Sequence, residues 1–149
     1  MQPEWVDYNG HMNVAYYVLI FDHATDAFLE CIGMNEAARI ASRASVFVVE
    51  AHLTYEKEVM VGDALSVESR ILDADSKRMH LFHQMTCPSN NPDQVVATNE
   101  LMLLYVDMMT RRSADMPATI LSTIKKLICN QNDLPTPIQV GSTIGIRRR

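Results

Sequence analysis

The amino-acid sequence predicts an α+β fold in which an antiparallel sheet wraps around one long, central helix. The first observation is a segment after Asn13 whose apolar residues recur at helical spacing. The second is a change to strand-forming composition after residue 44, and the third is a set of turn-forming residues between the strands. A helix that is apolar on most of its faces must be buried, and a curled sheet is an economical way to bury it.

The boundaries of this helix can be read from its sequence. Asn13 is typical of an N-cap, and Gly33 can end the helix in the left-handed conformation. No charged residue occurs from Val14 to Phe21, which predicts that the first half of the helix is enclosed on every side. Acidic residues then recur every fourth position and predict one polar stripe, formed by Asp22, Asp26 and Glu30.

Five strands are expected in the sheet. Four of them follow the helix, at Ser45–Tyr55, Ala64–Leu72, Arg78–Cys87 and Val95–Val106. Gln2–Val6 is expected to add a fifth strand at one edge. Turn signals lie between the four strands at 61–63, 73–77 and 88–93, so we expect consecutive strands to pair as antiparallel hairpins.

The rest of the chain fits one domain with a tail. A short helix is expected at 36–41, and an outer helix at 117–127, where Pro117 suits the first helical turn. We therefore predict a single domain over residues 1–127. Residues 128–149 are broken by prolines and end in three arginines, which predicts an irregular C-terminal tail.

Composition excludes several classes of function. The net charge of -5 and the pI of about 5.4 disfavour nucleic acid as a partner, because phosphate backbones require a concentrated basic surface. No stretch reaches the roughly 18 apolar residues that a membrane span requires, so no membrane partner is expected. Three widely spaced cysteines without a C-x-x-C pair suit reduced thiols and a cytoplasmic location. The histidines lack the spacing of metal ligands, and no metal is expected.

The stretch at 4–17, EWVDYNGHMNVAYY, crowds an acid, an Asn-Gly turn and a helix cap between aromatic residues. One interpretation is a β-hairpin with Asn9 and Gly10 in a type I′ turn. The helical periodicity after Asn13 instead favours a turn that joins a strand to the helix. Asp7 then lies at the strand end and faces the first backbone N–H groups of the helix, which attract negative charge. A carboxylate that faces free N–H groups suits acyl transfer, because the acid can attack or activate water while the amides bind the oxyanion. The simpler alternative is that Asp7 only caps the turn.

These residues carry a family resemblance. The motif consists of Asp7, Gly10, His11, Asn13 and Tyr17. It resembles the D-x-x-G-H-x-N segment of hotdog-fold acyl-CoA thioesterases of the 4-hydroxybenzoyl-CoA thioesterase-like type. The segment VVEAHLTYEKEVMVGDALSVESRILDADSKRMHLFHQM is similar to the middle hairpin of that family, and the order of elements matches from about Pro3 to Leu127. The sequence PEWVDYNGHMN is also similar to that of thioesterase-like domains linked to carnitine breakdown, for which betainyl-CoA is the suggested substrate.

The resemblance implies a hotdog fold and hydrolysis of an acyl-CoA thioester to a free acid and coenzyme A. Asp7 takes the place of the catalytic carboxylate, acting either as a nucleophile that forms a mixed anhydride or as a general base for water. The N–H groups near Met12 and Val14 take the place of the amides that polarise the thioester carbonyl. Gly10 and Tyr17 belong to the same motif and are expected to contact the substrate.

Five further candidates remain. His11 and Asn13 fit the motif as catalytic residues, but His11 also suits bracing of the turn and Asn13 suits capping of the helix. Trp5 and Tyr8 belong to an aromatic set that can receive a quaternary ammonium group through cation–π attraction. Glu50 either faces solvent or, in this fold, lies across a dimer cleft from the substrate.

The implied partners are an acyl-CoA substrate and further copies of the chain. A homodimer, with a homotetramer as the larger alternative, would join sheets edge to edge and pair the active sites. Coenzyme A belongs to the substrate, so no separate cofactor is expected. The alternatives to a thioesterase are a protein that binds acyl-CoA without cleaving it and a hydratase-like hotdog protein.

Overall fold

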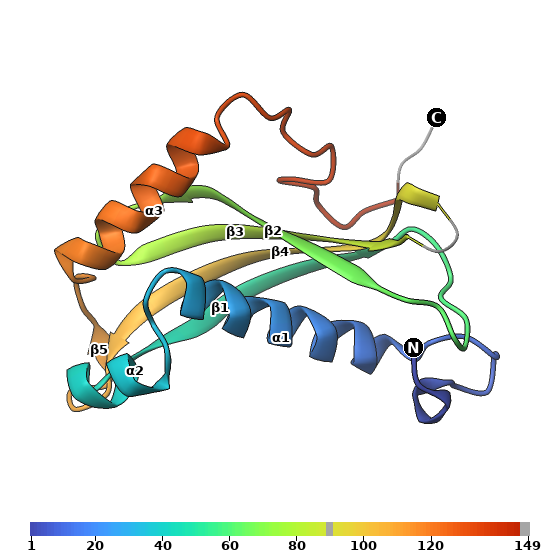
Figure 1. Cartoon of the computed structure of the whole chain (residues 1–149), viewed down its shortest axis with the longest axis horizontal. Helices are drawn as coiled ribbons and strands as arrows, with labels where there is room; N and C mark the ends of the chain where they lie inside the picture. Colours follow the sequence, from blue (N-terminus) through green and yellow to red (C-terminus); the bar gives the residue numbers. More distant parts are fainter. Residues whose placement is uncertain (89–90, 147–149) are drawn as a thin grey trace.

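The computed structural model of this chain, which describes residues 1–88 and 91–146, confirms the hotdog arrangement (Figure 1). One long helix, α1 (Val14–Cys31), runs along the concave face of an antiparallel sheet. The main strands are β1 (Ala44–Tyr55), β2 (Ser66–Ala74), β3 (Arg78–Cys87) and β4 (Asn91–Asp107). Their order across the sheet is β1-β4-β3-β2, so β1 and β2 form the two edges.

The fifth strand is not where the sequence placed it. Gln2–Val6 was expected as an edge strand, but this segment contains a short 3-10 helix, η1 (Pro3–Trp5), and a single bridge between Val6 and Met12. Pro3 explains the difference, because proline lacks an N–H group and suits the first turn of a helix. The fifth strand is instead β5 (Arg112–Ser113), which pairs with the end of β4.

Two of the three predicted hairpins form. β2 pairs with β3 and β3 pairs with β4, both antiparallel. The expected pairing of β1 with β2 is wrong, because β4 returns between β1 and β3 and pairs with both. The chain from 56 to 65 therefore crosses from one sheet edge to the other, past the start of α1. The turn predicted at 88–93 includes residues 89 and 90, which lie outside the described part of the chain.

The boundaries of α1 agree with the sequence, but its burial does not. Asn13 Oδ1 accepts a hydrogen bond from Ala15 N at 2.9 Å, and Gly33 has a φ of 89°, so both predicted ends are confirmed. The acidic stripe is exposed as expected. The first half is not enclosed on every side, because the sheet covers only one side of the helix. The exposed apolar residues are Val14 (59%), Val18 (47%) and Leu19 (37%).

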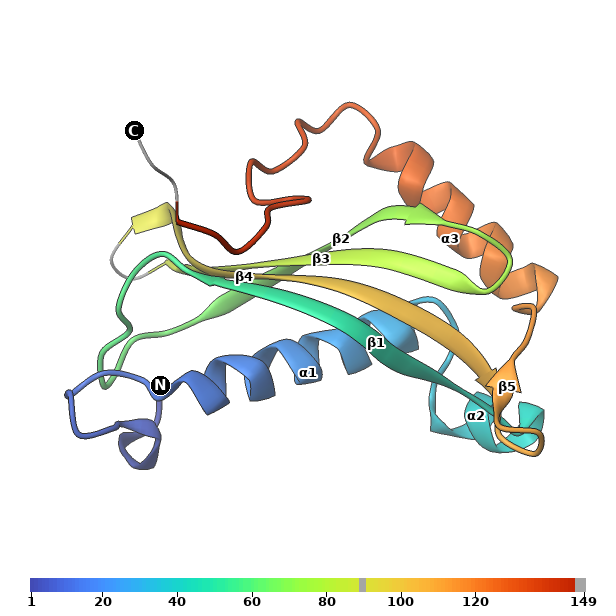
Figure 2. The same ribbon diagram turned by 180° about the vertical axis from the view of Figure 1, so that it is seen from behind.

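Two other helices flank this arrangement. α2 (Glu36–Ser42) forms next to β1, and α3 (Ala118–Asn130) packs beside β2 and extends three residues past its predicted end. Residues 131–146 contain no helix or strand and pass over the outer face of the sheet (Figure 2). No helix within the described ranges is both long and apolar enough to cross a bilayer. The cytoplasmic location stays a prediction.

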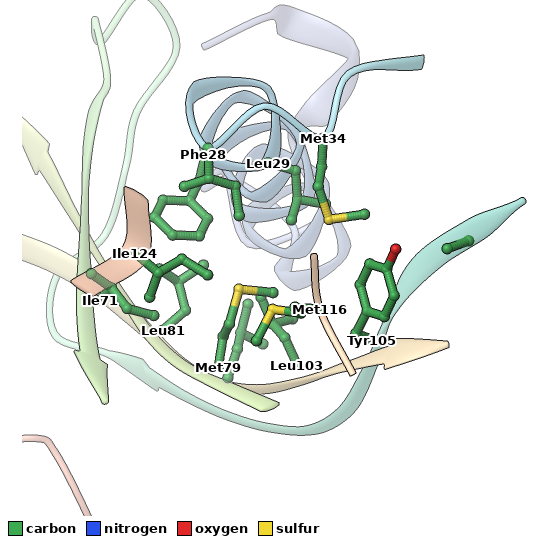
Figure 3. Close-up of a cluster of buried hydrophobic side chains, with 13 residues drawn as sticks. Phe28, Leu29, Met34, Ile71, Met79, Leu81, Leu103, Tyr105, Met116 and Ile124 are labelled. Atoms are coloured by element: carbon green, nitrogen blue, oxygen red, sulfur yellow. The ribbon is translucent and has the colours of Figure 1, made fainter. Parts of the chain in front are cut away.

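The main core lies between the second half of α1, the sheet and α3. Figure 3 shows Phe28 and Leu29 of α1 facing Met79, Leu81 and Leu103 of the sheet. Ile124 of α3 is fully buried in the same cluster, so α3 closes the β2 edge of the core. A second cluster, around Phe21 and Met85, lies toward the start of α1 and supports the segment that precedes it.

A polar network lies within this core, beneath α1. His83 of β3 is fully buried, with Ser69 Oγ 2.8 Å from its Nδ1 and Thr25 Oγ1 3.0 Å from its Nε2. Thr25 Oγ1 donates to Phe21 O at 2.9 Å, so Nε2 of His83 is the donor to Thr25 and Nδ1 accepts from Ser69. Burial lowers the pKa of His83 to about 4, which keeps the ring neutral.

We expect His83 to make the fold less stable in acid. Its pKa falls from 6.5 in the unfolded chain to about 4 in the folded chain, so the unfolded state binds the proton more strongly between these values. Stability is therefore lost as the pH falls from about 6.5 towards 4, by up to about 3 kcal/mol. Urea unfolding at several pH values, compared with His83→Gln, checks this. A variant that loses stability as steeply as the wild type across that window would contradict the assignment.

Candidate active site

A tight turn precedes α1. Asp7 N donates to His11 O at 2.9 Å, and Gly10 N donates to Asp7 O at 3.1 Å. The central residues of the turn are Tyr8 and Asn9, and Gly10 follows with a φ of 85°, a conformation that glycine adopts without strain. The type I′ interpretation, with Asn9 and Gly10 as the central residues, is wrong, because it requires positive φ at both and Asn9 does not have one.

Asp7 follows the short helix η1 and not a strand, which corrects the sequence expectation. Its side chain is half-buried, and Oδ1 accepts a hydrogen bond from Asn9 N at 2.8 Å. Within residues 1–88 and 91–146, Oδ2 has no hydrogen-bond partner. One oxygen of the carboxylate therefore holds the turn, as the simpler interpretation expected, while the other is left for a ligand.

The turn is attached to two neighbouring segments by backbone hydrogen bonds. Met12 N donates to Val59 O at 3.0 Å, which joins the turn to the crossover between β1 and β2. Asn13 N donates to Trp5 O at 2.9 Å, which joins the start of α1 to η1. These bonds use two of the N–H groups that the sequence had offered for a thioester carbonyl.

Asn13 caps the next part of the helix. Its Oδ1 accepts from Ala15 N at 2.9 Å, and its backbone oxygen accepts from Tyr16 N at 3.0 Å. Among the amides from Met12 to Tyr16, Val14 N alone has no acceptor. The helix start therefore offers one N–H group, with the partial positive charge of the helix dipole behind it, to an oxygen in front of α1.

A pocket of about 240 Å³ opens at this point. It is lined by Asp7, His11, Met12, Val14, Tyr17, Tyr55, Glu56, Lys57 and Glu58. Five of these residues come from the predicted site, and the other four come from the end of β1 and the segment after it. Sites for drug-sized ligands usually measure about 300–1,000 Å³, so this pocket suits the acyl end of a larger molecule.

Aromatic rings form one wall of the pocket. Tyr17 and Tyr55 meet edge to face, with ring centroids 5.2 Å apart and an interplanar angle of 77°. The Tyr17 hydroxyl donates to Lys57 O at 3.5 Å. Burial, and then the neighbouring Tyr55, raise the pKa of Tyr17, so its hydroxyl remains a neutral donor.

His11 makes a contact of the kind expected from a bracing residue. Its Nε2 lies 3.2 Å from Glu58 Oε2, which belongs to the crossover segment. Because His11 O also accepts from Asp7 N, this residue connects the turn to the segment that follows β1. Acidic residues are in excess in the pocket lining. Asp7, Glu56 and Glu58 carry negative charge there, whereas Lys57 carries a permanent positive charge.

Besides Asn13, which caps the helix, four sequence candidates lie outside the pocket lining. Trp5 stacks on Tyr16, with centroids 5.1 Å apart, and Gly10 only shapes the turn. Tyr8, the suggested partner of Trp5, is 97% exposed. Glu50 lines a different pocket on the outer face of the sheet, together with Glu100. None of these four residues lines the pocket that contains Asp7.

The sequence did not reveal the contribution of the segment after β1. Tyr55, Glu56 and Glu58 were not predicted as site residues, because they are more than forty positions from Asp7. The available signal was the concentration of charge in YEKE directly after an apolar strand. In the described ranges, no group of three or more His, Cys, Asp or Glu side chains is arranged to hold a metal ion.

Comparison with known proteins defines the class of this chain. The family model of the thioesterase-like superfamily matches residues 1–124, and the chain belongs to that superfamily. The chain is 32% identical to a Staphylococcus aureus protein whose structure was solved in complex with CoA. The TM-score is 0.92, over 99% of this chain and 91% of the other. The hotdog fold expected from the sequence is thereby confirmed.

Two relatives narrow the class further. The betainyl-CoA thioesterase of Pseudomonas aeruginosa is 40% identical over 144 residues, which cover 97% of this chain and 89% of that protein. The L-carnitine dehydrogenase/betainyl-CoA thioesterase of Agrobacterium fabrum is 39% identical over 140 residues. That alignment covers 94% of this chain but only 28% of the larger protein. The predicted enzyme class, an acyl-CoA thioesterase, is confirmed.

Proposed function

We propose that this enzyme hydrolyses the coenzyme A thioester of a small, positively charged acyl group, with Asp7 as the catalytic carboxylate and Val14 N as the oxyanion donor. The observation that carries the proposal is the pocket that holds both groups, with Oδ2 of Asp7 and the N–H of Val14 unpaired. The acid supplies the nucleophile or base, and the amide stabilises the negative charge that develops on the thioester oxygen.

The carboxylate serves either route of hydrolysis. As a nucleophile, Oδ2 of Asp7 attacks the thioester carbon, the thiolate of coenzyme A leaves and takes up a proton, and water then hydrolyses the mixed anhydride. As a general base, the same oxygen removes a proton from the water that attacks the carbon; the C–S bond then breaks, and the thiolate of coenzyme A leaves and takes up that proton. In both routes the bond from Asn9 N to Oδ1 fixes the orientation of the carboxylate.

The lining of the pocket supports a cationic acyl group. The Tyr17–Tyr55 pair and two glutamates line the space beside Asp7. A quaternary ammonium group gains about 0.5–2 kcal/mol from an aromatic face, and nearby carboxylates add Coulomb attraction. Betainyl-CoA, the substrate in the names of the two relatives, has such a group. We therefore propose betainyl-CoA as the substrate.

We further propose that the enzyme works as a homodimer joined at β1. Within the described residues β1 pairs only with β4, so its other edge offers unpaired backbone groups. Val48 and Val49 on this strand are 49% and 55% exposed, and the uncovered side of α1 adds more apolar surface. Because Tyr55 ends the same strand, a second protomer at this edge would lie close to the pocket.

Asp7→Asn should reduce the rate of thiol release by about 10² to 10⁴, the usual contribution of a general base. The asparagine oxygen can still accept from Asn9 N, so the turn is retained while the charge is removed. A thiol-release assay on betainyl-CoA measures kcat, and Asp22→Asn, an exposed acid of α1, serves as the matched control. An Asp7→Asn enzyme with more than a tenth of wild-type kcat would exclude Asp7 as the catalytic carboxylate. If the wild type retains acyl-CoA but releases no thiol, the result would favour the alternative of a protein that binds acyl-CoA without cleaving it.

Tyr55→Leu should weaken selection for a cationic acyl group, and Tyr55→Phe should preserve it. The measurement is the ratio of kcat/KM for betainyl-CoA to that for tert-butylacetyl-CoA, whose acyl group has the same shape but no charge. Loss of an exposed cation–π contact of about 0.5–1 kcal/mol lowers this ratio about two- to fivefold. Equal ratios for the leucine and phenylalanine variants would count against an aromatic contact with the cation.

Val49→Lys should shift the protein from dimer to monomer and lower its activity. A lysine on the β1 edge places a charge in the proposed interface, a device that proteins use to block edge pairing. Light scattering after size-exclusion chromatography gives the mass. The control is Leu134→Lys, which adds the same charge at an exposed apolar residue after α3 and not on β1. A Val49→Lys protein of wild-type mass would exclude β1 as the interface.

A further inference from the structure

The segment 131–146, here called the C-terminal tail, is held against the sheet by polar contacts. It crosses the outer face of the sheet and ends near the end of β1 (Figure 2). Its large apolar residues Ile138 and Ile144 are 91% and 93% exposed, so burial of these side chains does not fix its path. Polar contacts instead hold the tail at three places.

The first contact is made by Arg70 of β2. Its guanidinium donates to Pro135 O at 2.7 Å, to Leu134 O at 2.8 Å and to Gln131 O at 3.3 Å. These carbonyls lie directly after α3, where backbone oxygens have no helical partner. Arg70 thereby sets the direction in which the tail leaves the helix.

The second contact holds a turn in the middle of the tail. Ser142 N donates to Gln139 O at 3.1 Å, and Gly141 has a φ of 70°, which favours glycine. Gly141 N lies 2.8 and 3.1 Å from the two carboxylate oxygens of Glu100. Glu100 is itself fixed by His80, whose Nε2 lies 2.7 Å from Oε1. Glu100 therefore holds this turn over the sheet.

The third contact connects the tail to the pocket beside Asp7, here called the acyl pocket. Gln139 Nε2 donates to Glu56 Oε1 at 3.4 Å, a long hydrogen bond. Glu56 N and Lys57 N both donate to Val96 O, so the chain leaves β1 at this residue. Glu56 lines the acyl pocket and also the groove beneath the tail, which is lined by Gln139. One carboxylate thus belongs to both places.

The other acids of the pocket are already engaged. Asp7 carries the proposed chemistry, and Glu58 lies 3.2 Å from His11. Glu56 is the remaining lining carboxylate, and it is exposed, so without a partner its side chain would sample several rotamers. The bond from Gln139 restricts it and leaves Oε2 available to a ligand.

We propose that Glu56 selects acyl groups with a positive charge and that Gln139 of the C-terminal tail is the positioning residue for Glu56. This inference rests on the proposed thioesterase function and adds a specificity device to it. The tail, although outside the pocket, sets the location of the negative charge that faces the acyl group.

The test uses the two isosteric substrates, betainyl-CoA and tert-butylacetyl-CoA, with the full-length enzyme. Glu56→Gln should lower the ratio of their kcat/KM values about five- to tenfold, since one charge is lost within a few ångströms of the cation. Gln139→Ala should lower the ratio about two- to threefold, as expected for one weak contact. Asn132→Ala changes an exposed amide of the same tail and should leave the ratio unaltered.

The double variant separates positioning from a general effect on the fold. If Gln139 acts through Glu56, adding Gln139→Ala to Glu56→Gln should not lower the ratio further. A ratio that Glu56→Gln leaves unchanged, or additive effects in the double variant, would overturn the inference while thiol release still upholds the thioesterase. Failure of the wild type to hydrolyse either substrate would instead overturn the proposed function and this inference with it.

Discussion

The bond from Met12 N to Val59 O is the constraint on which the site depends. It attaches the turn before α1 to the crossover that follows β1, and Val59 is fully buried at this junction. Together with the contacts of His11 with Glu58 and of Tyr17 with Tyr55, it fixes the start of α1 beside the end of β1. Because a buried backbone N–H needs a partner, the same bond also removes Met12 from the set of oxyanion donors. Val14 N is left as the proposed donor, because the amides around it are hydrogen-bonded.

The features that were predictable from the sequence are those determined by local chemistry. Asn13 and Gly33 mark the ends of α1 because capping and left-handed conformations depend on the residue at one position. The exposed acidic stripe follows from helical periodicity alone. The motif around Asp7 also stands together in space, because its members lie within one turn and the first turns of one helix. Its catalytic role was indicated by family resemblance and remains to be tested by mutation.

Features that depend on distant segments were not predictable in this way. The pairing of β1 with β4 places Tyr55 and Glu56 beside the start of α1, and no local pattern specifies that pairing. The exposure of Val14 was misjudged for a related reason: an uncharged sequence shows that a surface must be covered, but not by which chain. In the proposed dimer a second protomer would cover it. Likewise, the contact of Gln139 with Glu56 joins residues 83 positions apart.

The crossing of the chain from one sheet edge to the other also has a consequence for how the protein folds. β1 finds its partner only when β4 has been synthesised, since Ala44 pairs with Asp107 and Tyr55 with Ala97. Until then a twelve-residue apolar strand has no neighbour on either side. Such long-range pairing slows folding, and an unpaired strand invites association between nascent chains. The edge proposed to join folded protomers is thus also a surface prone to aggregation during synthesis.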